Sequence, residues 1–189
     1  SHFVVAYRDD NTKYGMVCIG SVSGSSISFG SEYTVKSGNT DGISVDSIDS
    51  SHFVVAYSSS GVARIGTVSG SSISFGSEYV FNSATTYAIS VSILDSSHFV
   101  VAYQDYGNSK YGTAIIGTVS DDTISFGDEY VFNTGETDYI SSSSLDASHF
   151  IVSYQDVSNS KHGTSIAVSY THLRAHETPE HLVCRLLLE

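Results

Sequence analysis

A short apolar stretch occurs four times along the chain. Its copies are SHFVVAY at residues 1–7, 51–57 and 97–103, and the variant SHFIVSY at residues 148–154. Both alternating faces of FVVAY are apolar, because Phe, Val and Tyr fall on one side and Val and Ala on the other. A strand of this kind is covered on both of its faces. The pattern therefore predicts one buried strand in each repeat.

Three other strand-like stretches accompany each copy. Examples are YGTAIIGTV at residues 111–119, ISFGSEYVF at residues 73–81 and YAISVSIL at residues 87–94. The second carries Ser and Glu and is expected to be half exposed, and in the third Ile and Val alternate with Ser. Tight turns such as Val-Ser-Gly-Ser at residues 22–25 separate the stretches. We expect four short antiparallel strands per repeat and no helix in residues 1–167.

The length of the repeat points to a fold class. Copies that start at residues 1, 51, 97 and 148 define a period of 46 to 51 residues, the size of a four-stranded propeller blade. The pattern I-S-V-x-x-[IL]-D-x-[SA]-H-F-V-V-A-Y-x-D resembles the first hairpin of blades in the sialidase-like and related bacterial propellers. The sialidase Asp-box is absent, and the chain has no Trp.

This resemblance implies an all-β fold of tandem four-stranded antiparallel blades in an incomplete β-propeller ring. Complete blades are expected at residues 43–81 and 88–132, and partial blades at residues 1–35 and 139–167. An open stack of sheets and a set of tandem sandwich domains are the alternative all-β architectures.

The composition changes abruptly near the C-terminal end. Residues 168–189, VSYTHLRAHETPEHLVCRLLLE, contain five Leu and the only Pro, whereas residues 1–167 contain two Leu. This segment resembles the translation of a transposase-type sequencing-library adapter. The resemblance implies a non-native tail, able to form a short helix through HLVCRLLLE, on a shotgun fragment whose genuine part is residues 1–167.

Charge and apolar content argue against nucleic-acid and membrane partners, and cysteine content argues against an intrachain disulfide. Charged residues make up 15% of the chain and the formal net charge is −12. An acidic surface argues against nucleic acid, and no apolar run approaches the roughly 20 residues of a membrane-spanning helix. We therefore expect no nucleic-acid partner and no membrane insertion. Cys18 is the single cysteine of residues 1–167, so no intrachain disulfide forms there.

The loops after the apolar copies carry the candidate binding residues. The loops read RDDNTKYG at residues 8–15, QDYGNSKYG at residues 104–112 and QDVSNSKHG at residues 155–163. Their candidate ligand-binding residues are Asp9, Asp10, Asn11, Tyr14, Asp105, Tyr106, Asn108, Tyr111, Asp156 and Asn159. Asp and Asn oxygens in a short turn either bind Ca²⁺ or accept bonds from their own backbone. Because a full EF-hand spacing is absent, we expect turn chemistry and no cofactor, with Ca²⁺ as the one candidate ion.

Tyrosines and histidines recur beside these loops and turns. Tyr14, Tyr87, Tyr106, Tyr111 and Tyr139 flank the loops, where a surface Tyr suits sugar recognition by stacking and hydrogen bonding; the alternative is that they fill strands. One His begins each apolar copy, and equivalent positions on separate sheets are too far apart to share one metal ion. Residues 1–167 contain no G-x-S-x-G elbow and only two Arg, so we expect no catalytic site.

These observations favour a non-enzymatic repeat module of a secreted or cell-surface protein. Its loops at the blade edges would bind a glycan or a surface protein, and the remaining blades of the full-length chain would cover its ends. The alternatives are a non-catalytic fragment of a sialidase-like glycan-processing enzyme and a structural spacer in a large surface protein. Because the end blades would expose apolar faces, the isolated fragment is expected to self-associate.

Overall fold

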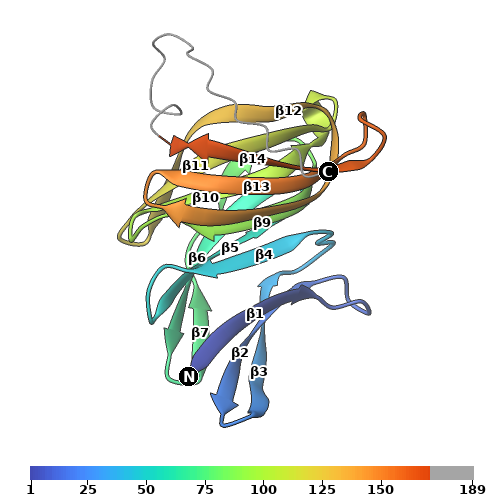
Figure 1. The fold of residues 1–189 in the computed structure, drawn as a ribbon. Coiled ribbons are helices and arrows are strands. Elements are labelled where there is room, and N and C mark those ends of the chain that lie inside the picture. Colours follow the sequence, from blue (N-terminus) through green and yellow to red (C-terminus); the bar gives the residue numbers. More distant parts are fainter. Residues whose placement is uncertain (171–189) are drawn as a thin grey trace.

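The computed structural model describes residues 1–170, and these residues form an all-β structure (Figure 1). One short 3₁₀ turn, η1 (Tyr106–Asn108), lies between two strands. The strands are β1 (His2–Arg8), β2 (Gly15–Ser23), β3 (Ser26–Lys36), β4 (Ile43–Ser47), β5 (His52–Tyr57), β6 (Gly61–Ser69), β7 (Ser72–Phe75), β8 (Tyr79–Asn82), β9 (Thr86–Ile93), β10 (His98–Asp105), β11 (Tyr111–Ser120), β12 (Thr123–Asp146), β13 (His149–Asp156) and β14 (His162–Ser169). The all-β class predicted from the sequence is confirmed.

Antiparallel pairing groups the strands into four sheets, each made of neighbours in the sequence. The first sheet has the order β1–β2–β3, and the second has the order β4–β5–β6, with both β7 and β8 paired to β6. The third sheet contains β9, β10, β11 and the N-terminal part of β12, and the fourth contains the C-terminal part of β12, β13 and β14. Because β12 passes from the third sheet to the fourth, these two are continuous in hydrogen bonding (Figure 1).

The strand formed by the second apolar copy, β5, lies between two other sheets. Its Phe, Val and Tyr side chains pack with Val17, Ile19 and Val35 of the first sheet. Its alternate residues, Val54 and Ala56, pack with the third sheet. Each residue from 53 to 57 is at most 1% exposed. We call the Phe-Val-Tyr side of each sheet its receiving face and the Val-Ala side its covering face.

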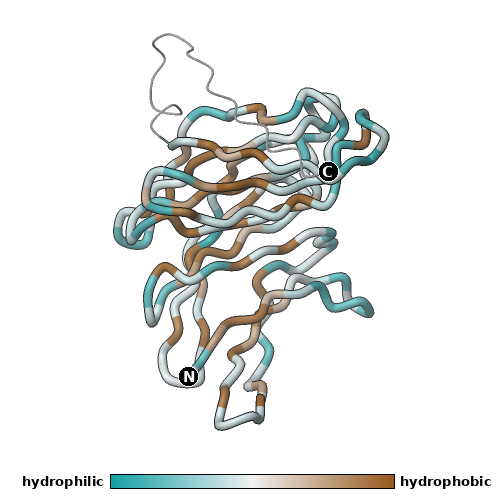
Figure 2. The backbone as a smooth tube through the Cα atoms, in the orientation of Figure 1, coloured by the Kyte–Doolittle hydropathy of each residue, from teal (hydrophilic) through white to brown (hydrophobic). Residues whose placement is uncertain are grey.

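The third apolar copy, β10, repeats this arrangement one sheet further along. Its receiving face, Phe99, Val101 and Tyr103, packs with the second sheet. Its covering face, Val100 and Ala102, packs with the fourth sheet. Apolar residues accordingly run along the middle strands of the stacked sheets (Figure 2). The predicted burial on both faces is confirmed for the second and third copies.

The first copy, β1, differs because only one of its faces meets another sheet. Val4 and Ala6 on its covering face pack with the second sheet. Phe3, Val5 and Tyr7 point to the opposite side, since side chains alternate along a strand, and all three are only half-buried. Two-sided burial is therefore wrong for this copy, because no sheet of the described chain lies against its receiving face. It is also wrong for the fourth copy, β13 (His149–Asp156), in which Ile151 is half-buried and Ser153 is exposed on the covering face.

A phenylalanine ring packs directly over a glycine on the receiving faces of the first three sheets. A Cβ atom added to Gly66 would lie 2.1 Å from the ring of Phe53, and one added to Gly117 would lie 2.1 Å from the ring of Phe99. The ring therefore occupies the space that any larger residue would need. This packing explains why a glycine precedes Thr-Val in the second and third repeats.

A tyrosine on the receiving face of each of the first three sheets donates a hydrogen bond to a glutamate of the same sheet. The pairs are Tyr7–Glu32, Tyr57–Glu78 and Tyr103–Glu129. The Oη of Tyr103 lies 2.7 Å from Oε1 of Glu129, and burial together with this carboxylate raises the pKa of Tyr103. The tyrosine hydroxyl is thus buried with its hydrogen bond made, which removes the cost of an unpaired polar group.

Serine side chains link the leading strands of adjacent sheets, which are β4, β9 and residues 137–146 of β12. The Oγ of Ser44 in β4 accepts a hydrogen bond from the N–H of Val91 in β9 at 3.0 Å. One sheet further along, the Oγ of Ser90 in β9 accepts from the N–H of Ser142 in β12 at 2.9 Å. These bonds satisfy backbone donors at the free edges of the leading strands. Alternation of Ser with Ile and Val in these strands follows from this role.

Other details of the prediction differ from the structure. The stretch 73–81, predicted as one strand, forms β7 and β8, because the side chain of Arg64 donates to the carbonyl oxygen of Gly76 at 2.7 and 2.9 Å where the strand breaks. The last strand, β14, continues to Ser169, two residues beyond the predicted end of the repeat region. The helix considered for HLVCRLLLE lies outside the described residues.

Candidate functional site

The loops that follow the repeated apolar strands lie at one edge of the sheets. Asp105, at the end of β10, pairs with Thr86 at the start of β9 and with Tyr111 at the start of β11, so these three segments meet. In the fourth sheet, Thr137 pairs with Asp156 at the equivalent position. We call this surface the loop edge, made of residues 9–14, 58–60, 86–88, 106–110, 136–139 and 157–161 (right side of Figure 1).

The aspartates of the first loop are occupied by contacts within the loop. Oδ1 of Asp9 accepts from the N–H groups of Asn11 and Thr12 at 3.0 and 2.6 Å and from the Thr12 hydroxyl at 2.8 Å. These bonds, with that from the Thr12 backbone the largest, lower the pKa of Asp9. Oδ1 of Asp10 pairs with Nζ of Lys13 at 2.6 Å. Their carboxylates therefore hold the turn through contacts of the kind expected for turn chemistry.

The corresponding aspartates of the other two loops play the same part. Asp105 is 4% exposed, and its Oδ1 accepts from the N–H of Gly107 at 2.9 Å, which caps the 3₁₀ turn. Oδ1 of Asp156 accepts from the N–H of Asn159 at 3.1 Å. Asn108 and Asn159 are exposed on the turns themselves. The shared Asp-x-x-Asn spacing thus positions an aspartate to stabilise the turn and leaves the asparagine amide facing solvent.

Exposed tyrosines distinguish the loop edge from the rest of the described surface. Tyr14 and Tyr87 are each 37% exposed, Tyr106 is 54% exposed and Tyr139 is 80% exposed. Tyr111, by contrast, is half-buried at the start of β11. Of the predicted ligand-binding tyrosines, Tyr14 and Tyr106 therefore present their rings to solvent, and Tyr87 and Tyr139 add two more.

Two of these rings form a cluster with an ion pair. The rings of Tyr87 and Tyr106 meet edge to face, with centroids 5.9 Å apart at an interplanar angle of 74°. Nζ of Lys110 lies 5.5 Å from the Tyr106 ring centroid and 2.7 Å from Oε1 of Glu136. The hydrogen bond to Glu136 raises the pKa of Lys110. Nothing local in the sequence pairs Lys110 with Glu136, which belongs to the next strand, and neither was predicted as a site residue.

A local backbone distortion turns Tyr139 towards solvent. Pairing between β12 and β13 shifts register between Asp138 and Ser141, and Tyr139 has a φ of 51°. Ala88 has a φ of 48° at the matching shift in β9. A tyrosine in this left-handed region is uncommon, and bulges of this kind often re-aim a side chain. The distortion places the Tyr139 ring on the loop edge. In a regularly paired strand, its direction would have been set by the alternation of side chains.

Asp, Ser and His come together at the opposite edge in a form that resembles a catalytic triad. Nδ1 of His52 lies 2.9 Å from Oδ2 of Asp49 and 3.1 Å from Oγ of Ser51. In a Ser-His-Asp triad the serine contacts Nε2 and the aspartate contacts Nδ1, whereas here both contact Nδ1. Oδ1 of Asp49 also accepts from the backbone N–H groups of Ser51 and His52 at 2.7 and 2.8 Å. The group is therefore arranged to close a turn.

The same turn recurs at the two following junctions between repeats. Its other members are Asp95, Ser97 and His98, and Asp146, Ser148 and His149. His52, His98 and His149 therefore each belong to a separate turn, whereas Nδ1 of His2 contacts Oγ of Ser21 at 2.9 Å. Within residues 1–170, no group of three or more His, Cys, Asp or Glu side chains could hold a metal ion.

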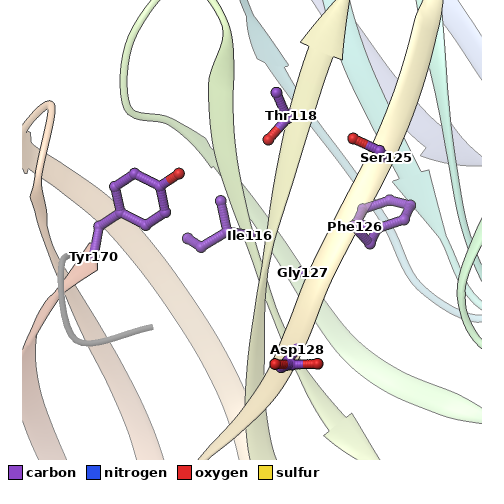
Figure 3. A pocket seen from close by; sticks show the side chains of 7 residues that line it. All are labelled: Ile116, Thr118, Ser125, Phe126, Gly127, Asp128 and Tyr170. Carbon is purple, nitrogen blue, oxygen red and sulfur yellow. The ribbon is translucent and has the colours of Figure 1, made fainter. Parts of the chain in front are cut away.

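A shallow cavity of about 200 Å³ lies where β14 ends beside β11 and β12. Its lining residues are Ile116, Thr118, Ser125, Phe126, Gly127, Asp128 and Tyr170. Figure 3 shows Tyr170 beside Ile116, whereas the Phe126 ring lies on the other side of β12. The volume is below the roughly 300–1,000 Å³ of typical small-molecule pockets. The loop edge is therefore the stronger candidate for ligand binding.

No family model matches the chain, and no curated protein is similar to it. Among the described residues, no helix is long and apolar enough to cross a membrane.

Proposed function

We propose that the chain is a non-enzymatic module that binds carbohydrate at its loop edge. The observation that carries this proposal is the gathering of Tyr14, Tyr87, Tyr106 and Tyr139, all exposed, at one edge of the stacked sheets. An aromatic ring with a hydroxyl offers a sugar both an apolar face and a hydrogen-bonding group. The exposed amides of Asn108 and Asn159 lie on the same edge and add donors and acceptors.

Charge narrows the class of carbohydrate. The formal net charge of the chain is −12, and the lysine beside the tyrosine pair, Lys110, is already paired with Glu136. No cation in that cluster is left to meet a sulfate or a carboxylate. A neutral oligosaccharide therefore fits this cluster better than an anionic one.

We also propose that the four sheets are consecutive blades of a propeller-like structure. Three features support this assignment: strands that pair in sequence order within each sheet, receiving and covering faces that alternate from sheet to sheet, and serine bonds between leading strands. In such a structure the equivalent loops of successive blades lie side by side, which suits a shallow binding surface.

A binding role without catalysis is supported by how the polar side chains are used. The repeated Asp-Ser-His groups close turns, and the loop aspartates accept hydrogen bonds from their own backbone. We place the module on a secreted or cell-surface protein, a setting that suits a repeat module rich in Ser, Thr and Tyr whose proposed ligand is a sugar.

Titration of the full chain with neutral oligosaccharides, selected by a glycan array, tests the proposal. Tyr106→Ala and Tyr139→Ala should each weaken binding about two- to tenfold, since an aromatic contact contributes about 0.5–1.5 kcal/mol beyond its buried area. Leu145→Ala is the matched control, because Leu145 is 61% exposed but lies at the opposite edge. This control should bind as the parent chain does.

Other outcomes would point to the alternative functions. Binding that survives both tyrosine substitutions would exclude the loop edge as the site. Capture of a protein instead of any glycan, with loss in the same tyrosine variants, would assign the edge to protein recognition and overturn the carbohydrate proposal. Arg and acidic residues converging in the remaining blades of the full-length protein would favour the non-catalytic fragment of a glycan-processing enzyme, and binding to nothing would favour a structural spacer.

A further inference from the structure

The receiving face of the first sheet is an apolar surface that no described residue covers. Ile27 and Phe29 are 60% and 61% exposed on this sheet. Their counterparts in the second sheet are Ile73, which is 7% exposed, and Phe75, which is half-buried against the first sheet. The same sequence positions are therefore covered in the second sheet and open in the first.

The open face already has the geometry of the covered ones. The Phe3 and Phe29 rings meet edge to face with centroids 6.1 Å apart at 83°. The equivalent rings are 6.2 Å apart at 89° in the second sheet and 6.0 Å apart at 82° in the third. The ring of Phe3 also lies over Gly20, as in the other sheets. The face thus needs no rearrangement to accept a covering face.

At the other end of the stack, the fourth sheet carries a covering face with nothing described beyond it. This face consists of Ile151 and Ser153 in β13 and Ser165 and Ala167 in β14, opposite in direction to the buried Phe150 and Val152. The corresponding positions in the third sheet are Val100, Ala102, Ala114 and Ile116.

The serine pair on this face does not prevent its burial. Oγ of Ser153 lies 2.8 Å from Oγ of Ser165, so each hydroxyl has a partner on its own sheet. Ser and Ala are also similar in size, and Ala occupies both positions in the third sheet. The face therefore keeps small side chains at the two positions where the third sheet has Ala.

We propose that a second copy of this chain docks head to tail, with its fourth-sheet covering face on the open first-sheet receiving face. The contact would continue the interfaces seen three times within the chain, where a receiving face meets the covering face before it. It brings Phe3 and Phe29 against small residues. Two receiving faces docked against each other would instead oppose large rings to large rings, which interdigitate less well. The proposal does not depend on the loop edge.

A head-to-tail contact leaves one free receiving face and one free covering face on every assembly, so it adds further copies unless the ring closes. The unmodified chain should therefore show a mass that rises with concentration beyond a dimer in analytical ultracentrifugation, or a closed ring of fixed size. This behaviour differs from that of a symmetric dimer, which stops at two copies.

Two single substitutions block the two faces separately. Phe29→Lys places a charge on the receiving face, and Ala167→Lys places one on the covering face; both positions are exposed, so the fold should survive. Each variant alone should be monomeric. An equimolar mixture should form a one-to-one dimer and nothing larger, because Ala167→Lys retains a receiving face and Phe29→Lys retains a covering face.

The mixture separates the proposal from its rivals. A dimer of Ala167→Lys alone, with Phe29→Lys monomeric, would show two receiving faces docked together and would overturn the head-to-tail contact. A parent chain that stays monomeric up to high concentration would show that a second copy does not occupy this face. Circular dichroism of both variants, matched to the parent spectrum, confirms that any loss of association is not a loss of fold.

Discussion

The hydroxyl oxygen of Ser44 accepts a hydrogen bond from the backbone N–H of Val91 at 3.0 Å, which joins β4 to β9 across the junction of two sheets. Ser44→Ala leaves this edge donor without its partner, so the free energy of unfolding should fall by about 1–3 kcal/mol. Urea denaturation followed by circular dichroism measures the change. Ser47→Ala, at an exposed position on the same strand, should change it by less than about 0.5 kcal/mol.

Replacing a glycine beneath a phenylalanine ring by alanine should destabilise the fold more where the ring cannot move. Gly117→Ala places a Cβ 2.1 Å from the enclosed ring of Phe99 and should cost about 1–3 kcal/mol or more, as overpacking does. Gly20→Ala creates a similar clash with Phe3, at 2.3 Å, but that ring faces solvent and can move. Its cost should be smaller.

Gly163→Ala is the control for this series, because an added Cβ there would meet nothing within 4 Å. The predicted order of thermal destabilisation is Gly117 first, Gly20 second and Gly163 last. If Gly117→Ala and Gly20→Ala lowered the melting temperature equally, this would contradict the finding that the receiving face is covered in the third sheet and open in the first.

Arg64 joins the first and second sheets through its guanidinium group. Nη1 donates to the carbonyl oxygen of Val35 in the first sheet at 2.8 Å, while Nε and Nη2 donate to Gly76. Lysine cannot reproduce this fork, so Arg64→Lys should lower the free energy of unfolding by about 1–3 kcal/mol. Arg8→Lys, which affects exposed ion pairs at the loop edge, should have an effect below about 1 kcal/mol.

The Asp-Ser-His turns should make stability depend on pH in the acid range. Hydrogen bonds from Ser148 and His149 lower the pKa of Asp146 to about 2, and those from Ser51 and His52 lower the pKa of Asp49. A depressed pKa means that the stabilisation is complete above the unfolded value of about 3.9. It is then lost as the pH falls through the folded value.

Thermal denaturation between pH 5 and pH 2 checks this prediction. The melting temperature should fall as the pH falls below about 4. Asp146→Asn should be less stable than the parent chain at pH 5, and the difference should shrink towards pH 2. Asp122→Asn, in an exposed hairpin turn, is the control. A constant difference between Asp146→Asn and the parent would show that the carboxylate charge contributes nothing.

The strand pattern was predictable because it depends on local alternation. The two apolar faces of FVVAY and the turn residues between strands identify most of the strands, and burial of residues 53–57 and 99–103 followed from the same pattern. The break between β7 and β8 was not predictable, since it depends on Arg64 reaching Gly76 across the sheet. Alternation alone did not give the open side of β1, because it reports an apolar face but not whether another sheet lies against it; the expectation that the end blades expose apolar faces came from the incomplete ring.

The candidate site was predictable in part. Tyr14 and Tyr106 were identified from their place beside the loops, and both are exposed. The ring-and-ion cluster was not, because Lys110 and Glu136 meet only through the pairing of β11 with β12. The strong exposure of Tyr139 depends on its left-handed backbone at a register shift, for which the residue type gives no signal.

The central claim is that repeated sheets stack so that β5 and β10 are covered on both faces while β1 is covered on one. Amide hydrogen exchange, measured in the Phe29→Lys variant so that no second copy covers the first sheet, tests this most directly. Residues 54–57 and 100–103 should exchange most slowly, close to the rate of global unfolding, and residues 3–7 distinctly faster. Exchange in β5 and β10 as fast as in β1 would contradict the stacking of the sheets.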